Sequence, residues 1–212
     1  MSGKEKQINS EGSEIIVLGI AGPSGSGKST LVRNIATLLE DSETMFYDDY
    51  EPNYEKLTMD LGKLRNGETI TYPVSSRLIH PRRFIVIEEP TGRRCPGMYN
   101  KIDFLAYINI PLEVSFARVL IRSIETSEDN LINSFYETIG PQFNPKFSEK
   151  PTKLMHILHW QLRMYLQRHR QIYLNDHNEN MKDADLIVDG MKAKDELSKE
   201  IFENFIRWIK KI

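Results

Sequence analysis

Residues 22–30 combine glycines, serines and one lysine in a pattern suited to binding phosphate. Gly22 is followed, after four residues, by Gly27-Lys28-Ser29, which satisfies the P-loop pattern. Glycine has no Cβ and tolerates positive φ, so the backbone N–H groups can wrap closely around an anion. Lys28 is expected to reach the β and γ phosphates of a nucleoside triphosphate, and the Ser29 hydroxyl to ligate Mg²⁺. The predicted phosphate-binding residues are Gly22, Pro23, Ser24, Gly25, Ser26, Gly27, Lys28, Ser29 and Thr30.

Two adjacent carboxylates, Asp48 and Asp49, follow a short run of β-forming residues at 44–47. In open α/β sheets ligands bind at the carboxyl ends of the strands, so one carboxylate can act as the general base toward a substrate hydroxyl. We favour Asp48, because strand alternation would turn Asp49 to the opposite side. A solvated acidic turn is the plainer alternative.

A further carboxylate, Glu88, closes the apolar run at residues 84–87. At the end of a buried strand it can hold Mg²⁺ or the water ligands of that ion, and Glu89 competes for the same role. The predicted metal ligands are therefore Ser29 and Glu88.

Arginines provide the positive charge. Arg118 and Arg122 lie four apart on one face of a predicted helix, which suits a mobile lid around residues 118–150 that neutralises the transferred group and excludes water. A charged, solvated helix face is the alternative. Arg93, next to Arg94, is a lesser candidate for substrate binding.

Tyrosines beside the acidic pair could stack on a nucleobase or a sugar, with ordinary core packing as the alternative. The predicted substrate-binding residues are Asp48, Asp49, Tyr50, Tyr72 and Arg93.

The elements that must position these side chains alternate between strands and helices. An apolar run at 15–20 predicts the strand before the P-loop, and helical spacing over 31–39 predicts the helix after it, which disfavours a glycine-rich turn that binds nothing. This order predicts an α/β, three-layer P-loop NTPase fold with about five parallel core strands, a central P-loop strand and a helical lid. Other predicted elements are strands at 44–47, 84–87, 104–110 and 185–190, an edge strand or hairpin arm at 69–74, and helices at 54–65, 152–174 and 197–212.

Composition narrows the function classes. At 212 residues the chain is expected to form one domain, residues 14–212, after a mobile tail at 1–13. A net charge of −2 argues against a nucleic-acid partner, and no apolar run has membrane-spanning length, so a cytoplasmic protein without a membrane partner is expected. Cys95 is the single cysteine, which excludes an intrachain disulfide; a plain loop residue is favoured over a thiolate activated by its arginine neighbours.

A rival signature is that of the GTPases. Residues 89–92 resemble their D-x-x-G switch, and Asn100-Lys101-Ile102-Asp103 spells N-K-x-D. The first position is Glu89, however, and Asn100 precedes a predicted strand, so a guanine-binding switch is disfavoured.

Several motifs together resemble the uridine kinase and nicotinamide riboside kinase group of P-loop nucleoside kinases. They are the P-loop, the segment Tyr47-Asp48-Asp49-Tyr50, the hairpin with Tyr72-Pro73-Val74, the strand ending in Glu88, and Arg118 with Arg122 at the start of the lid. The resemblance implies that Asp48 is the base, with Lys28 and the lid arginines beside it in catalysis, and that ATP and Mg²⁺ are used.

Departures from that family leave the acceptor open. Its glycine after the strand-ending glutamate is Glu89 here, followed by Pro90, and the lid has fewer arginines. The leading hypothesis is an ATP-dependent kinase acting on a hydroxyl of a nucleoside-like or other small molecule. The alternative is a nucleotide-binding regulator without transfer activity. A homo-oligomer is a further open expectation.

Overall fold

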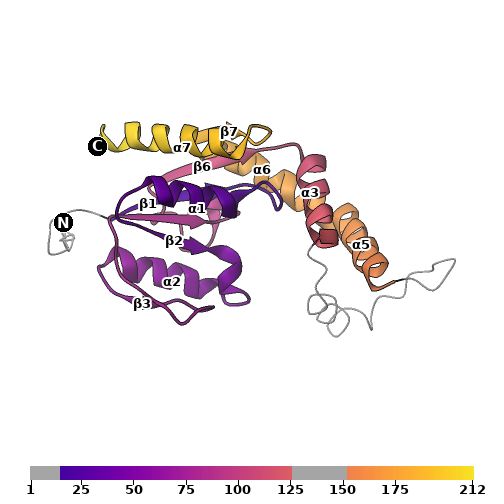
Figure 1. Cartoon of the computed structure of the whole chain (residues 1–212), viewed down its shortest axis with the longest axis horizontal. Coiled ribbons are helices and arrows are strands. Elements are labelled where there is room, and N and C mark those ends of the chain that lie inside the picture. Colours follow the sequence, from indigo (N-terminus) through magenta and orange to yellow (C-terminus); the bar gives the residue numbers. More distant parts are fainter. Residues whose placement is uncertain (1–14, 126–151) are drawn as a thin grey trace. The chain divides into compact units, whose positions relative to one another are not determined.

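The computed structural model describes residues 15–125 and 152–212 (Figure 1). The chain forms two compact units, one from Met1–Ile110 with His177–Ile212 and the other from Pro111–Asp176. The expected tail at 1–13 and residues 126–150 of the expected lid lie outside the described residues. Within the described ranges, no helix combines the length and apolarity needed to span a bilayer.

The first unit is built on a parallel five-stranded sheet in the order β2-β5-β1-β6-β7. The strand that leads into the P-loop is central, with β5 on one side and β6 on the other. The predicted α/β fold with five parallel strands is thus confirmed. The strands are β1 (Ile16–Ala21), β2 (Ser42–Phe46), β5 (Phe84–Glu88), β6 (Phe104–Asn109) and β7 (Leu186–Asp189).

Helices cover both faces of this sheet, because its strands carry apolar side chains on both sides. Along β5, Val86 joins the core beneath α1 (Lys28–Leu38) and α7 (Lys194–Ile209). Ile85 and Ile87 join the opposite core, beneath α2 (Tyr54–Arg65). Figure 1 shows α7 on one side of the sheet and α2 on the other.

A small hairpin and two short helices complete the first unit. β3 (Ile70–Thr71) pairs antiparallel with β4 (Leu78–Ile79). β2 ends at Phe46 and is followed by the 3₁₀ helix η1 (Tyr47–Tyr50), so the expected strand alternation across Asp48 and Asp49 is wrong. A second 3₁₀ turn, η2 (Gly92–Arg94), follows β5.

The second unit contains α3 (Leu112–Glu125) and α5 (Lys153–Met164). Phe116 stacks on Tyr165 with ring centroids 4.0 Å apart, and the Gln161 amide donates to the Ser123 hydroxyl at 2.8 Å. A helix was expected at 152–174. After α5 the structure has a π-helical segment, η4 (Tyr165–His169), and then α6 (Arg170–Asp183), which ends nine residues later than expected.

Candidate active site

The P-loop connects the carboxyl end of β1 to the start of α1, and its backbone has the shape that the glycines permit. Gly25 and Gly27 have φ of 81° and 96°. Gly22 has φ of 152°, and a Cβ there would lie 2.9 Å from the Ser26 hydroxyl and 3.3 Å from the Ile108 carbonyl oxygen. The Ser26 N–H closes the loop onto the Pro23 carbonyl at 3.1 Å. A residue larger than glycine at position 22 would therefore deform the loop.

The first turn of α1 is suited to an anion. It contains no acidic residue, and no side chain caps it. The leading N–H groups of a helix have no intrahelical partner and lie at the positive end of the helix dipole. The Ser26 hydroxyl is buried without a hydrogen-bond partner in the part of the chain that the structure describes. These features fit the phosphates of a nucleotide.

Lys28 and Glu88 form a buried ion pair beneath the loop. The Lys28 ammonium lies 3.7 Å from Glu88 Oε1 and donates to the Pro23 carbonyl at 3.1 Å. Both side chains are 6% exposed. Glu88 pairs in register with Ile20 of β1 and Phe46 of β2, so it lies between the strand before the P-loop and the strand before Asp48.

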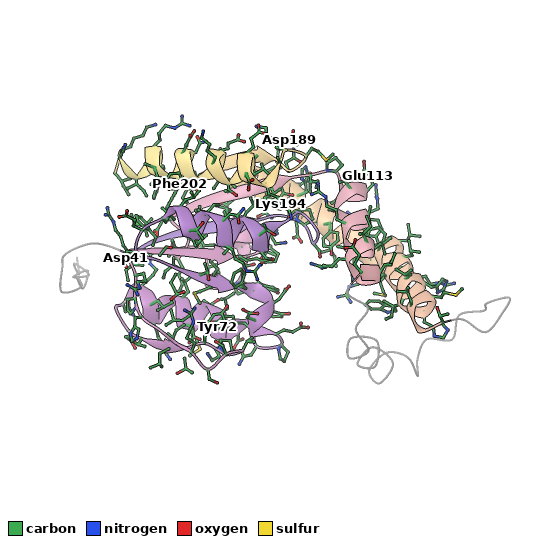
Figure 2. The ribbon with its side chains drawn as sticks, viewed as in Figure 1. Asp41, Tyr72, Glu113, Asp189, Lys194 and Phe202 are labelled. Atoms are coloured by element: carbon green, nitrogen blue, oxygen red, sulfur yellow. The ribbon has the colours of Figure 1, made fainter. Side chains whose placement is uncertain are left out.

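These strand registers place the predicted base near the P-loop's edge of the sheet. Asp48 comes two residues after Phe46, and Gly22 comes two residues after Ile20. Figure 2 shows the polarity of this sheet: Asp41, just before β2, and Asp189, the last residue of β7, lie at opposite ends. The P-loop, Glu88 and Asp48 share the end where Asp189 lies, because all five strands are parallel.

The two predicted carboxylates of η1 differ in environment. The Asp48 side chain is exposed. The Asp49 side chain is half-buried and accepts a hydrogen bond from the Tyr72 hydroxyl at 2.6 Å. This difference supports Asp48 as the carboxylate available to a substrate, although the reason is the Tyr72 contact and not strand alternation.

Tyr50 and Tyr72 were expected to contact substrate, but both rings are packed in the core beside α2. They meet edge-on with centroids 5.7 Å apart. Burial, together with nearby Asp60, raises the pKa of Tyr50 far above its usual value. The position of these rings favours the packing interpretation.

Glu89 does not share the environment of Glu88. Its side chain is 0% exposed, and Oε1 accepts hydrogen bonds from the N–H and hydroxyl groups of Thr91 at 3.1 and 2.8 Å. Burial raises the pKa of this carboxyl group. Glu89 is therefore built into the loop after β5, and the choice of Glu88 as a metal ligand stays a prediction.

Cys95 directly follows η2 in the same loop and is half-buried. Burial and the nearby Glu89 carboxyl raise the pKa of the Cys95 thiol to about 12. A protonated thiol is a poor nucleophile, so this position fits the expected plain loop residue.

Arg93 is held by groups within the first unit. Its guanidinium donates to the carbonyls of Ile102 at 3.0 Å and Asp183 at 2.8 Å. It also pairs with the Asp185 carboxylate, which in turn accepts from the Leu105 N–H. These contacts give Arg93 a structural role, and its expected contact with substrate stays a prediction.

Arg118 and Arg122 lie on α3, and both side chains are exposed. They belong to the second unit, so their expected role in a lid stays a prediction.

The GTPase-like segment lies at the wrong end of the sheet for a nucleotide contact. Asp103 precedes β6, and its carboxylate accepts from the Val17 N–H at 2.7 Å and binds Arg65 at 2.8 Å. Val17 is near the start of β1, whereas the P-loop follows its end. The aspartate of the N-K-x-D match therefore has a structural role at the amino ends of the strands.

One residue that the sequence did not single out is Asn180 on α6. It is fully buried, and its side-chain amide donates to the Pro90 carbonyl at 3.4 Å. Pro90 directly follows Glu88 and Glu89 in the chain. Its partner is 90 positions away in the chain, and no local pattern marks such a contact.

A parallel sheet with a central P-loop strand, a buried lysine and a strand-ending glutamate defines a P-loop nucleotide-binding protein of the α/β class. Comparison with known families agrees, since the family described as "KAP family P-loop domain" matches residues 5–212. The chain belongs to this family.

Curated relatives include uridine kinases. That of Shewanella amazonensis is 24% identical over 170 residues, covering 61% of this chain and 80% of the relative. That of Lactobacillus helveticus is 27% identical over 175 residues, covering 65% and 82%. The predicted resemblance to uridine kinases is confirmed.

Two solved structures are also similar. The possible uridine kinase from Bacillus stearothermophilus is 22% identical, with a TM-score of 0.39 over 61% of this chain and 85% of its own. The shikimate kinase from Acinetobacter baumannii is 15% identical, with a TM-score of 0.44 over 91% and 94%. At these TM-scores neither match bears on the assignments that follow.

Proposed function

We propose that the protein is an ATP-dependent kinase that transfers the γ-phosphoryl group of ATP to a hydroxyl group of a small, nucleoside-like molecule. The observation that carries the proposal is the alignment of three groups on neighbouring strands. Glu88 is in register with both Ile20 and Phe46, so the P-loop, a strand-ending carboxylate and the exposed Asp48 follow three adjacent strands.

Each group has a role in phosphoryl transfer. The N–H groups of the P-loop and the Lys28 ammonium bind the phosphates. Ser29 and Glu88 would hold Mg²⁺, which would neutralise charge on the phosphate oxygens. Asp48 accepts the proton of the acceptor hydroxyl while the oxygen of that hydroxyl bonds to the γ phosphorus and ADP leaves.

The Lys28–Glu88 pair is consistent with these roles. The Glu88 carboxylate, 3.7 Å away, and the Pro23 carbonyl hold the ammonium group at the P-loop. In this proposal Arg118 and Arg122 of α3, whose side chains are exposed, neutralise charge on the transferred group.

Nucleoside-like acceptors are favoured because the curated relatives are named uridine kinases.

The test is to incubate the full chain with ATP, Mg²⁺ and a panel of nucleosides and other small alcohols, and to measure ADP. We expect ADP release that depends on one acceptor, together with a phosphorylated form of that acceptor detected by mass spectrometry. ATP binding without acceptor-dependent ADP release across the panel would instead support a nucleotide-binding regulator. Acceptor-independent hydrolysis of GTP would support the GTPase alternative.

A further inference from the structure

Tyr72 makes three contacts with the segment that carries Asp48. Its hydroxyl donates to Asp49 Oδ2 at 2.6 Å and accepts from the Phe46 N–H at 3.1 Å. Its ring packs edge-on against Tyr50, at an interplanar angle of 89°. The side chain thus touches the end of β2, the middle of η1 and the end of η1.

The hairpin that contains Tyr72 is itself attached to β2. The Tyr72 N–H donates to the Arg77 carbonyl at 2.8 Å, which makes these two residues the closing pair of the hairpin loop. The Arg77 guanidinium binds Glu43 of β2 at 3.0 Å. β2 is an edge strand of the five-stranded sheet, so the hairpin reaches it through side chains of the closing pair.

The remaining residues of η1 are also fixed. Tyr47 stacks on Tyr54 of α2, with centroids 4.3 Å apart and planes 9° from parallel. Asp49 and Tyr50 are held by Tyr72. Asp48 is the one residue of η1 whose side chain is exposed.

We propose that Tyr72 is a positioning residue, whose hydroxyl holds η1 in the conformation that presents Asp48 to the acceptor. This inference rests on the proposed function, in which Asp48 is the general base. A general base must lie within hydrogen-bonding distance of the proton it removes, and a misplacement of about 1 Å can lower turnover by about 10²-fold. Holding Asp49 also keeps its carboxylate from competing with Asp48 for the acceptor proton.

The Tyr72 hydroxyl is suited to this task across the neutral range. Burial and the hydrogen bond to Asp49 raise the pKa of Tyr72 well above its usual value, so the hydroxyl keeps the proton that it donates. The ring is 7% exposed and would stay packed if the hydroxyl were removed.

The main variant is Tyr72→Phe, which keeps the ring contact with Tyr50. We expect kcat to fall about 10- to 100-fold while KM for ATP changes by less than about 2-fold, because the P-loop is untouched. The matched control is Arg77→Gln, which breaks the exposed ion pair of the same hairpin and should leave kcat within about 2-fold. An equal loss in both variants would overturn the proposal, because hairpin attachment in general would then be the cause.

Asp49 provides the second half of the test. Asp49→Asn keeps an oxygen that can accept from Tyr72 and should lose less activity than Asp49→Ala. Tyr72→Phe combined with Asp49→Ala should be no slower than the slower single variant, since both remove the same hydrogen bond. Fully additive losses would contradict the proposal.

A readout without turnover separates this inference from the proposed function. The Phe46 N–H donates to the Tyr72 hydroxyl, so amide exchange at Phe46, measured by NMR, should be about 10-fold faster in Tyr72→Phe than in the wild-type protein. If the wild-type protein transfers no phosphate, the proposed function fails while this exchange still tests the hold on η1. Unchanged exchange at Phe46 would overturn the positioning role even in an active kinase.

Discussion

At the scale of the residue, the exposed carboxylate of Asp48 is the group on which the proposed chemistry depends. Asp48→Asn keeps the size of the side chain and removes the base. We expect kcat to fall by about 10²- to 10⁴-fold with ATP binding retained, measured by ADP release and by nucleotide titration. Asp41→Asn makes the same chemical change at the opposite end of the sheet and should leave turnover unaffected (Figure 2). Unaltered turnover in Asp48→Asn would remove the assignment.

The single cysteine gives a prediction about pH. A thiol pKa raised to about 12 means that Cys95 stays protonated through the neutral range, and its thiolate fraction grows about tenfold per pH unit up to that value. At pH 8 that fraction is about 10³-fold below that of an ordinary cysteine, and alkylation should be slower by a similar factor. Iodoacetamide labelling followed by mass spectrometry measures this.

Denaturation provides the control for Cys95, because unfolding removes both the burial and the nearby Glu89 carboxyl. The labelling rate should then rise to that of a small thiol. Fast labelling of the folded protein at pH 8 would show that the thiol is activated, as its two arginine neighbours in the sequence would favour.

The sequence predicts candidate site residues where one short motif carries the chemistry, as in the P-loop. The roles that it suggests for Asp48 and Glu88 stay predictions. It does not predict that the Tyr72 hydroxyl donates to Asp49, or that Arg93 donates to the Asp183 carbonyl, which is 90 positions away. Such partners are decided by tertiary packing, and a single sequence does not encode them in any local spacing.

At the scale of the element, the loop after β5 is fixed by close packing. Gly92 has φ of 61°, and a Cβ there would lie 2.8 Å from both Asn180 Oδ1 and a Leu105 methyl carbon. Gly92→Ala should lower the free energy of unfolding by about 2–4 kcal/mol through backbone strain and overpacking, measured by urea denaturation.

Gly27→Ala is the matched control for this packing effect. Gly27 also has positive φ, of 96°, but an added Cβ would meet nothing within 4 Å. Its cost should be the backbone strain alone, about 1–2 kcal/mol. If the two variants were equally destabilised, the close approach of an added Cβ at position 92 to Asn180 and Leu105 would have no energetic importance.

Element boundaries follow the sequence where apolar residues form a clear pattern. This pattern is a helical period in α2 and a continuous run in β1, β5 and β6. The end of α6 lacks such a pattern, because residues 175–183 are mostly polar, and the helix is held there by the buried amide of Asn180. η1 is missed for a related reason, since a four-residue turn held by a distant tyrosine has no period of its own.

At the scale of the whole molecule, binding of ATP and Mg²⁺ should stabilise the fold. At about 100 times Kd the ligand adds about 2.7 kcal/mol, which for a chain of this length raises Tm by about 5–10 °C in thermal denaturation. Lys28→Met should abolish most of this rise. The rise in Tm is compared and not the Tm itself, because removing one partner of a buried ion pair also lowers the Tm measured without ATP. An equal rise in Lys28→Met would mean that ATP binds elsewhere.

The class of fold is predictable at this scale, because alternating strands and helices around a P-loop allow few arrangements. The full strand order is not, since the sequence indicates only that the P-loop strand is central. Nor does it mark Asp176–His177 as the point where the chain passes between compact units, because the break falls inside a continuous helix.

The hairpin of β3 and β4 is joined to the edge strand by two side chains, with its own short ladder separate from the sheet. Insertions or substitutions at its tip, residues 73–76, therefore leave the register of the five-stranded sheet unchanged. A chain built in this way can diverge at the tip while the closing pair, Tyr72 and Arg77, stays constant. The tip can thus change in length or sequence while η1 stays attached to Tyr72.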